Sequence, residues 1–484
     1  MKKLILVLMP AMVLAQPAPA PAPAPAKAAV EAPKNRAPVS KEVLKVKLPR
    51  AVEMHLDNGL TVLILEDHRL PTVSMSLELR GAGALYEPAN MTGLASATAT
   101  MLREGTTTRT SKEISEAVDR LAASVSANAG QGGVATSVYV SGLTENFDQW
   151  FPLAVDVFLR PSFPADEWAK LKQRLVVNLR NQRTQAGFLA RERFNKTVYG
   201  GHPAAVYSAT PESIEAITPE AMKKWHDERY APQNAILGIA GDVTAAQIMP
   251  KLKTALAGWK KTEAALPAVP ATTPAAEKHV VIVNRAGSVQ TNLMMGNIAI
   301  DRRSPDYVAL MVMNQVLGSG SSARLFNNLR EDKGYTYGAY SNVSADQYAG
   351  PWEATAEVRT DVTAGSMREF YNEFNRIRDE KVPAAELEEK QRTMVARYAL
   401  QLESPTGLLG LAITLKTYNL PADYWDTYPA KIAAVTAEEV QRVARKYLTL
   451  DNIQIIAVGD AAKVKPVLEK YGPVTVYGVD GKVM

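Results

Sequence analysis

The hydrophobic and polar positions at the start of the folded region follow the pattern of β-strands. Apolar residues alternate with polar ones over residues 52–56, and a second apolar run covers residues 61–65. Between them, Asp-Asn-Gly-Leu at residues 57–60 is typical of a tight turn. We therefore predict a β-hairpin, followed by another apolar-rich strand over residues 72–80.

Further along, apolar residues recur every three or four positions, which is the periodicity of an amphipathic helix. This spacing predicts helices over residues 111–121, 147–159 and 164–185, with a strand over residues 136–143. A helix is also predicted around Ser96. Because strands and helices mix without a regular strand–helix–strand alternation, we predict an α+β fold.

An internal repeat organises the chain into two halves. Four short matches between the halves share one offset of 218 positions. The matched pairs are Thr218 and Thr436, Asn234 and Asn452, Gly241 and Gly459, and Lys172 and Lys390. Four matches in one register indicate two copies of one domain. A Pro- and Ala-rich stretch, residues 266–276, joins the copies.

Composition narrows the possible functions. The chain has 484 residues, of which 46% are hydrophobic, so it can bury at least two cores. Its 55 basic and 50 acidic residues form no basic blocks, and we expect no nucleic-acid partner. It contains no cysteine, which excludes disulfides, a thiol nucleophile and cysteine-bound zinc.

The N-terminal residues have the features of a secretory signal. Two lysines precede a short apolar run, residues 4–14, and Val13 and Ala15 suit a small-residue cleavage rule, so we predict a signal peptide over residues 1–15. The run is too short to span a bilayer comfortably. We therefore expect export, to the periplasm or outside the cell, without stable membrane insertion. Residues 16–45 begin with a Pro-Ala repeat, and we expect a flexible tether outside the fold.

One predicted helix has the spacing of a zinc site without its ligands. In residues 93–106, Gly-Leu-Ala-Ser-Ala-Thr-Ala-Thr-Met-Leu-Arg-Glu-Gly-Thr, the side chains of Ser96, Ala99 and Thr100 share one helical face. His, Glu and His at these positions would give His-x-x-Glu-His, where two imidazoles bind zinc and the carboxylate is a general base. The flanking Gly-Leu-Ala and Met-Leu-x-x-Gly-Thr resemble the pitrilysin/insulinase family of zinc peptidases. Hydroxyl and methyl groups cannot hold zinc.

The resemblance also implies a third zinc ligand, a glutamate about 77 residues beyond the second histidine. That count leads from Thr100 to Val177, and neither Val177 nor its neighbour Asn178 carries a carboxylate. Two separate segments therefore lack metal-binding side chains. We expect this chain to bind no metal and to have no catalytic residues of its own.

The second half carries another distinctive motif. A Gly-rich loop, residues 318–322, leads into a helical stretch. We predict that Ser321 or Ser322 caps this helix, that it ends near Lys333, and that Gly334 stops it. A strand rich in aromatic residues is predicted over residues 335–343.

The helix end and the strand can bring Arg330 and Tyr337 side by side. Leu-Arg-Glu-x-x-Gly-x-x-Tyr, residues 329–337, resembles the Arg/Tyr motif of the same family. The resemblance implies that the guanidinium and the phenol hold a carbonyl group of the substrate and stabilise the negative charge that develops on its oxygen. Arg330 could instead bond the last carbonyls of its helix or pair with a surface Glu, and Tyr337 could be a core aromatic.

Other sources of chemistry are less favourable. The Gly-rich loop lacks the Gly-Lys-Ser/Thr of a phosphate-binding loop. Ser96 has neither a strand–turn–helix elbow nor an evident base, as a serine nucleophile requires. The five histidines show no i, i+3 or i+4 pairing, so none is a good metal ligand.

The resemblance covers about residues 48 to 470 and implies two pitrilysin-like domains, residues 46–262 and 278–476, joined by a linker, residues 263–277. It implies that they form half of a clam-shell chamber. Two-chain members of the family place zinc in one chain and the Arg/Tyr pair in its partner. The resemblance therefore implies a non-catalytic, substrate-binding subunit that forms a heterodimer with a zinc-bearing chain and acts on unfolded peptides. Three alternatives stay open: a structural or assembly subunit, a stand-alone peptide-binding protein, and metal hydrolysis by other residues.

Overall fold

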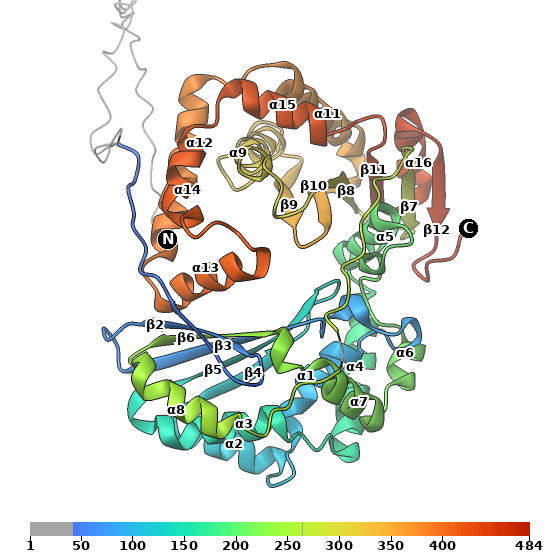
Figure 1. Ribbon diagram of the computed structural model, residues 1–484. Helices are drawn as coiled ribbons and strands as arrows, with labels where there is room; N and C mark the ends of the chain where they lie inside the picture. Colours follow the sequence, from blue (N-terminus) through green and yellow to red (C-terminus); the bar gives the residue numbers. More distant parts are fainter. Residues whose placement is uncertain (1–41, 264) are drawn as a thin grey trace, which may run out of the picture. The chain divides into compact units, whose positions relative to one another are not determined.

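A computed structural model describes residues 42–263 and 265–484 of the chain. The predicted signal segment lies outside these residues, as does nearly all of the predicted tether. Residues 43–484 form one compact unit, in which helices accompany two six-stranded sheets, one from each half of the sequence (Figure 1). This architecture confirms the predicted α+β fold and its duplication.

The first sheet has the strand order β1-β2-β6-β3-β5-β4. Its strands are β1 (Val52–His55), β2 (Thr61–Glu66), β3 (Thr72–Arg80), β4 (Ser124–Asn128), β5 (Ala135–Leu143) and β6 (Ala235–Gly241). The predicted hairpin is confirmed, because β1 and β2 pair antiparallel with Val52 opposite Ile64. The predicted strand over residues 72–80 is β3.

The second sheet repeats this plan in the order β12-β7-β11-β8-β10-β9. Its strands are β7 (Val280–Asn284), β8 (Gln290–Ile300), β9 (Thr336–Ala345), β10 (Ala349–Arg359), β11 (Gln454–Gly459) and β12 (Val474–Tyr477). The outermost strands beside β2 and β7 differ, since β1 runs antiparallel to β2 whereas β12 runs parallel to β7.

The helices also repeat along the chain. The first half contains α1 (Leu94–Met101), α2 (Ser111–Arg120), α3 (Phe147–Leu159), α4 (Ala165–Gln182), α5 (Ala186–Tyr199), α6 (Pro211–Ala216), α7 (Pro219–Arg229) and α8 (Ala245–Ala255). The second contains α9 (Tyr307–Leu317), α10 (Arg324–Phe326), α11 (Thr363–Asp379), α12 (Ala384–Gln401), α13 (Pro405–Tyr418), α14 (Tyr424–Ala433), α15 (Ala437–Tyr447) and α16 (Ala461–Leu468). Helix α15 begins and ends 218 positions after α7. None of the described helices combines the length and the apolar character that a bilayer crossing requires.

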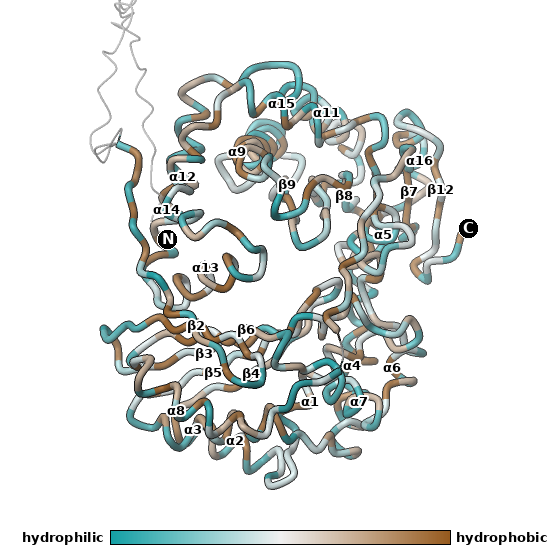
Figure 2. The backbone as a smooth tube through the Cα atoms, in the orientation of Figure 1, coloured by the Kyte–Doolittle hydropathy of each residue, from teal (hydrophilic) through white to brown (hydrophobic). Residues whose placement is uncertain are grey.

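Each half contributes one helix to the sheet of the other half. Helix α5 packs on β8 and β11, and α13 packs on β2 and β6. The approach of α13 is so close that a Cβ on Gly238 of β6 would lie 2.8 Å from the side chains of Leu409 and Ile413. This exchange explains why β2, β6, β7 and β11 are apolar apart from residues at their ends, since strands covered on both faces need no polar alternation (Figure 2 shows β2, β6 and β7).

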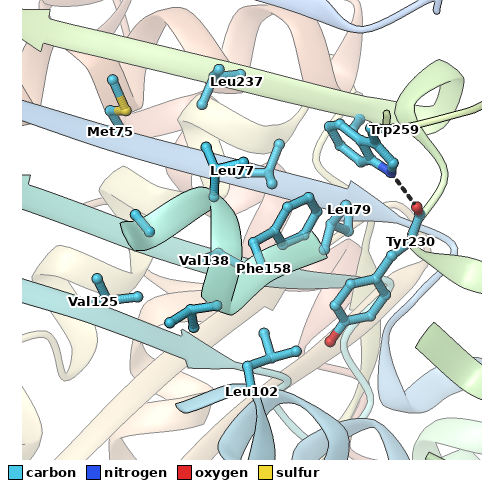
Figure 3. Close-up of a cluster of buried hydrophobic side chains, with 14 of the residues drawn as sticks. Met75, Leu77, Leu79, Leu102, Val125, Val138, Phe158, Tyr230, Leu237 and Trp259 are labelled. Atoms are coloured by element: carbon cyan, nitrogen blue, oxygen red, sulfur yellow. Dashed lines mark hydrogen bonds between the residues drawn. The ribbon is translucent and has the colours of Figure 1, made fainter. Parts of the chain in front are cut away.

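The first core lies on the opposite face of its sheet. Phe158 of α3 packs edge-to-face on Trp259 with ring centroids 4.8 Å apart, against Leu77 and Leu79 of β3 (Figure 3). The Trp259 indole donates a hydrogen bond of 2.7 Å to the Tyr230 carbonyl, which satisfies a polar group that would otherwise be buried without a partner.

Segments outside the sheets also bind the halves together. Leu44 and Leu48, before β1, pack against Tyr424 and Trp425 of α14. Leu44 lies in the predicted tether, so packing begins slightly earlier in the chain than predicted, because every second residue from Leu44 to Leu48 is apolar. In the predicted linker, the Thr272 hydroxyl donates a hydrogen bond of 2.8 Å to the Ala349 carbonyl.

Candidate functional site

Helix α1 is anchored at its first turn by a carboxylate. The chain enters the helix through Gly93 in the left-handed region, with φ +100°. Glu87 accepts hydrogen bonds from the Gly93 and Ala95 backbone N–H groups at 2.8 and 2.7 Å. Burial raises the pKa of the Glu87 carboxyl to about 7, although the two hydrogen bonds favour its charged form. Glu87 therefore fixes where the helix with the zinc-site spacing begins.

Two of the three zinc-site positions on α1 border a cleft. Ser96 and Thr100 line a cavity of about 510 Å³ that α4 borders on another side. The Thr100 hydroxyl donates to the Ser96 carbonyl one turn earlier, at 2.9 Å. Ala99 is only 1% exposed and belongs to the interior. The helix thus directs its outer face to the cleft, as the spacing predicts.

The position on α4 that faces this cleft is Asn178. The cleft-lining residues of α4 are Leu175, Asn178, Leu179 and Gln182, spaced i, i+3, i+4 and i+7 along one helical face. Val177 lies off that face and is 52% exposed. Asn178 rather than Val177 therefore faces the cleft, because one residue around a helix turns the side chain by about 100°.

The residues present do not fit a zinc ion. All fifteen described residues that line the cleft are uncharged, and hydroxyl, amide and apolar groups replace imidazole and carboxylate. Throughout the described part of the chain, no three His, Cys, Asp or Glu side chains are grouped so that they could hold a metal. The cleft therefore keeps a place for a ligand without the chemistry of a metal centre.

The second copy of this helix, α9, is bonded to a strand at the equivalent positions. Asn314 and Gly318 follow Ser96 and Thr100 by 218 positions. Ser341 of β9 bonds to both residues: its hydroxyl donates to the Asn314 side-chain oxygen at 2.6 Å, and its N–H donates to the Gly318 carbonyl at 3.0 Å. A Cβ on Gly318 would overlap the Ser341 backbone.

The helical stretch before Arg330 begins differently from the prediction. Its N-cap is Ala323, without a side-chain cap, so the prediction of Ser321 or Ser322 as the cap was wrong. The Ser322 carbonyl and hydroxyl instead accept hydrogen bonds from the Lys390 ammonium at 2.8 and 3.0 Å. Ser322 is therefore bonded to a lysine that is distant in sequence.

The end of this stretch is as predicted, but its winding is not. Gly334 adopts φ +62° directly after Lys333, which confirms the predicted stop. Before Lys333, α10 passes into a π-helical segment, η7 (Asn327–Asp332). The π-helix is a rare conformation that is often found at functional sites. The Asn328 side chain donates to Glu373 of α11 at 2.8 Å, which ties the segment to the core.

Arg330 and Tyr337 are both presented to solvent. The Arg330 guanidinium lies 4.8 Å from the centre of the Phe326 ring and 3.6 Å from the Glu331 carboxylate. Tyr337 is 90% exposed, so the alternative of a core aromatic is wrong. The two residues lie on adjoining elements, η7 and β9, and among the described residues no hydrogen bond joins them.

A β-bulge turns Tyr337 outward. Ala339 pairs with Ala356 and Thr336 pairs with Val358, so β9 has one more residue than β10 between these pairs. The Thr336 hydroxyl accepts the Gly338 N–H at 3.1 Å and lies 2.6 Å from the Glu357 carbonyl, to which it donates. Sequence reasoning missed Thr336, whose only signal is its place two residues before a glycine in a strand.

The fold, the zinc-site spacing on α1 and the motif of Arg330 and Tyr337 together define the class of protein. It is a metallopeptidase-type chain whose own metal position lacks metal ligands. Residues 61–211 match the family model for the insulinase peptidases, family M16, and residues 216–394 match the model for the inactive domain of peptidase M16. Together the two models cover more than half of the chain, which belongs to peptidase family M16.

Relatives of known sequence or structure support this assignment. The chain is 23% identical over 406 residues to the uncharacterized zinc protease YmxG of Bacillus subtilis, covering 81% of this chain and 95% of that protein. A peptidase M16 inactive domain from Pseudomonas fluorescens has a TM-score of 0.78 and 26% identity, covering 85% of this chain and 98% of that one. The periplasmic protease PqqL from Escherichia coli shares the fold, with a TM-score of 0.73 and 17% identity over 87% of this chain and 46% of that one.

Proposed function

We propose that this chain is the non-catalytic, substrate-binding subunit of a two-chain zinc metallopeptidase that acts on unfolded peptides. The observation that carries the proposal is the asymmetry of its two motifs. The metal positions hold Ser96, Ala99, Thr100 and, on α4, Asn178, whereas the Arg330 and Tyr337 motif is intact and exposed. The model for the inactive domain of peptidase M16 matches residues 216–394, the half that carries Arg330 and Tyr337.

Arg330 and Tyr337 supply hydrogen-bond donors in this proposal. A guanidinium and a phenol can both donate to a peptide carbonyl oxygen, and their donation strengthens as that oxygen gains negative charge. Both side chains are accessible, since Arg330 is 46% exposed beside Glu331 and Tyr337 is 90% exposed. The reacting metal and its ligands would belong to a second M16 chain, and this chain would bind and orient the peptide.

Export of the chain belongs to the same proposal. The N-terminal residues have the features of a signal peptide, and one protein of the same fold, PqqL, is described as periplasmic. We therefore place the two-chain peptidase outside the cytoplasm.

Affinity purification of the tagged, full-length chain from its own cells tests the proposal. We expect it to co-purify with a zinc-bearing M16 chain, and we expect the purified complex to cleave denatured peptides. The chain purified alone should hold no stoichiometric zinc and should cleave nothing. One tightly bound zinc per isolated chain, lost together with activity on chelation, would contradict the proposal.

A further inference from the structure

The helical turn that carries Arg330 is tied to helix α11 by one side chain. The Asn328 side-chain amide donates hydrogen bonds to the Glu373 carboxylate at 2.8 Å and to the Glu369 carboxylate at 3.3 Å. These two glutamates lie four positions apart on α11 and therefore share one face of that helix. A single amide thus bridges η7 to two carboxylates.

Both carboxylates are buried, so each hydrogen bond that they receive matters to the fold. The Glu369 side chain is 10% exposed and the Glu373 side chain is 7% exposed. Burial opposes the ionisation of Glu369, but hydrogen bonds from Asn372 and Asn328 help to hold its pKa below the ordinary value. A buried carboxylate that loses a donor is costly, and the two glutamates therefore hold the Asn328 amide in place.

Asn328 also shapes the turn through its backbone. Its carbonyl oxygen accepts a hydrogen bond of 3.0 Å from the N–H of Lys333, five residues later, which is the spacing of a π-helical turn. Arg330 lies between these two residues, with its guanidinium 4.8 Å from the centre of the Phe326 ring. Because each residue around a helix turns the side chain by about 100°, the register of this turn decides which way Arg330 points.

The bridge leaves one polar atom without a partner. The Asn328 side-chain oxygen is buried and, among the described residues, accepts no hydrogen bond. Such atoms are uncommon in native proteins, because each one lowers stability. The amide is therefore oriented for its two bonds to α11, which fixes the geometry of η7 at some expense of stability.

We propose that Asn328 is a positioning residue, which holds the π-helical turn in the register that presents Arg330 to a substrate carbonyl. The bonds to Glu369 and Glu373 supply the hold, and Asn328 acts on the substrate only through Arg330. The inference rests on the proposed function of Arg330 and adds the residue on which that function depends.

Hydrogen exchange of the full-length chain tests the hold without a partner chain. Asn328→Leu keeps the approximate shape of the side chain and removes both donors. We expect the backbone amides of Lys333 and Tyr335, both bonded within the turn, to exchange about 10-fold faster or more. The amides of α11 should exchange as before, which would show that the fold is intact. Unchanged exchange at Lys333 and Tyr335 would overturn the proposal.

The matched control is Asn372→Leu. Asn372 donates to the same carboxylate, Glu369, at 3.1 Å, but it lies on α11 itself and is exposed, so the fold should tolerate the change. Exchange in η7 should be unchanged. Equal effects of the two variants would trace them to Glu369 rather than to the bridge, and would overturn the proposal.

The activity of the assembled complex tests the positioning. Asn328→Leu should lower kcat/KM about 10-fold, because a misplaced Arg330 contributes less to the transition state. In an Arg330→Ala background the same substitution should cause no further loss, since both changes act through one guanidinium. An equal further loss in that background would assign Asn328 a purely structural role and overturn the positioning.

Exchanging donor and acceptor should restore the bridge. In Asn328→Asp combined with Glu373→Gln, the number of carboxylates is unchanged and the amide at 373 can donate to the carboxylate at 328. We expect exchange and kcat/KM within about 2-fold of the native values, and no recovery relative to Asn328→Leu would overturn the role of this bond. Full activity of Arg330→Ala would contradict the proposed function and the positioning together. Loss in Arg330→Ala without loss in Asn328→Leu would overturn the positioning alone.

Discussion

Helices α1 and α9 are two copies of one element, and they differ most at their ends. Both pack against the equivalent partner helix, α7 for α1 and α15 for α9. At the C-terminal end, α1 borders an open cleft, whereas α9 meets Ser341. The two copies thus share a helix pair and differ in what the C-terminal end of the first helix contacts.

The N-terminal ends of the same helices differ in electrostatics. Glu87 holds α1 with its pKa raised to about 7 by burial. Asp306 precedes α9 and receives hydrogen bonds from Arg442, Lys446 and Tyr447 of α15, at 2.7, 2.8 and 2.8 Å. The hydrogen bond from Arg442 is the main cause that holds the Asp306 pKa below its ordinary value. One copy therefore anchors its helix with a carboxyl that resists ionisation, and the other with one that favours it.

The largest expected difference concerns metal binding. Ser96→His, Ala99→Glu, Thr100→His and Asn178→Glu together should create a zinc site in the open cleft. With Val177→Glu in place of Asn178→Glu, zinc should bind roughly 100-fold more weakly. The reason is that a complete zinc site is worth about 10–16 kcal/mol, so each ligand contributes about 3 kcal/mol. Isothermal titration with zinc measures both affinities, and equal affinities would show that Asn178 does not occupy the ligand position.

The two anchors should respond to pH with opposite signs. A raised carboxyl pKa means that the native state binds more protons than the unfolded chain, so Glu87 should lower the free energy of unfolding as pH rises from about 4.5 to about 7, by at most about 3 kcal/mol. Glu87→Gln should flatten that slope. Because the pKa of Asp306 is lowered in the folded state, its ionised carboxylate stabilises the fold above about pH 3.8. That stabilisation is lost as the pH falls further, and Asp306→Asn should remove this acid dependence.

Urea unfolding at several pH values measures both slopes. The variants serve as controls for each other, since Glu87→Gln should leave the acid limb unchanged and Asp306→Asn should leave the slope near neutral pH unchanged. If the free energy of unfolding of Glu87→Gln still falls as the pH approaches 7, a group other than Glu87 causes that dependence.

The smallest expected effects come from paired alanine substitutions at the two helix ends. Gly318→Ala should cost about 1–3 kcal/mol of unfolding free energy, because the new Cβ overlaps the Ser341 backbone. Thr100→Ala in the open copy should change it by less than about 0.5 kcal/mol, because Thr100 is exposed. Thermal or urea denaturation provides the measurement. A costly Thr100→Ala would mean that the cleft is packed in solution.

Much of the fold was predictable because its signals are local. Alternation and helical periodicity located β1 to β3 and helices α2 and α3, and the offset of 218 positions identified the two halves. The exchange of α5 and α13 was not predictable, because nothing within either helix specifies which sheet it will cover. It explains afterwards why β6 is apolar throughout and β11 is apolar after Gln454.

The site was predictable in type rather than in detail. The face of Ser96 and Thr100 follows from helical spacing, but a count along the chain missed Asn178 by one residue. Ser322 failed as a helix cap because Lys390, which is distant in sequence, bonds to it. Tyr337 is exposed through a bulge, which depends on pairing with β10 rather than on its own neighbours.

The most direct test of the proposed role is the activity of an assembled complex that carries Arg330→Ala. We expect kcat/KM to fall roughly 10- to 150-fold, because a charge-assisted hydrogen bond worth about 1.5–3 kcal/mol is lost from the transition state. Tyr337→Phe should have a smaller effect, corresponding to about 0.5–1.5 kcal/mol. The matched control is Arg368→Ala, whose guanidinium also lies 3.6 Å from a neighbouring glutamate and is exposed. It should leave activity unchanged, with co-elution showing that each complex assembles. Full activity in an assembled Arg330→Ala complex would contradict the proposal that this chain presents the substrate.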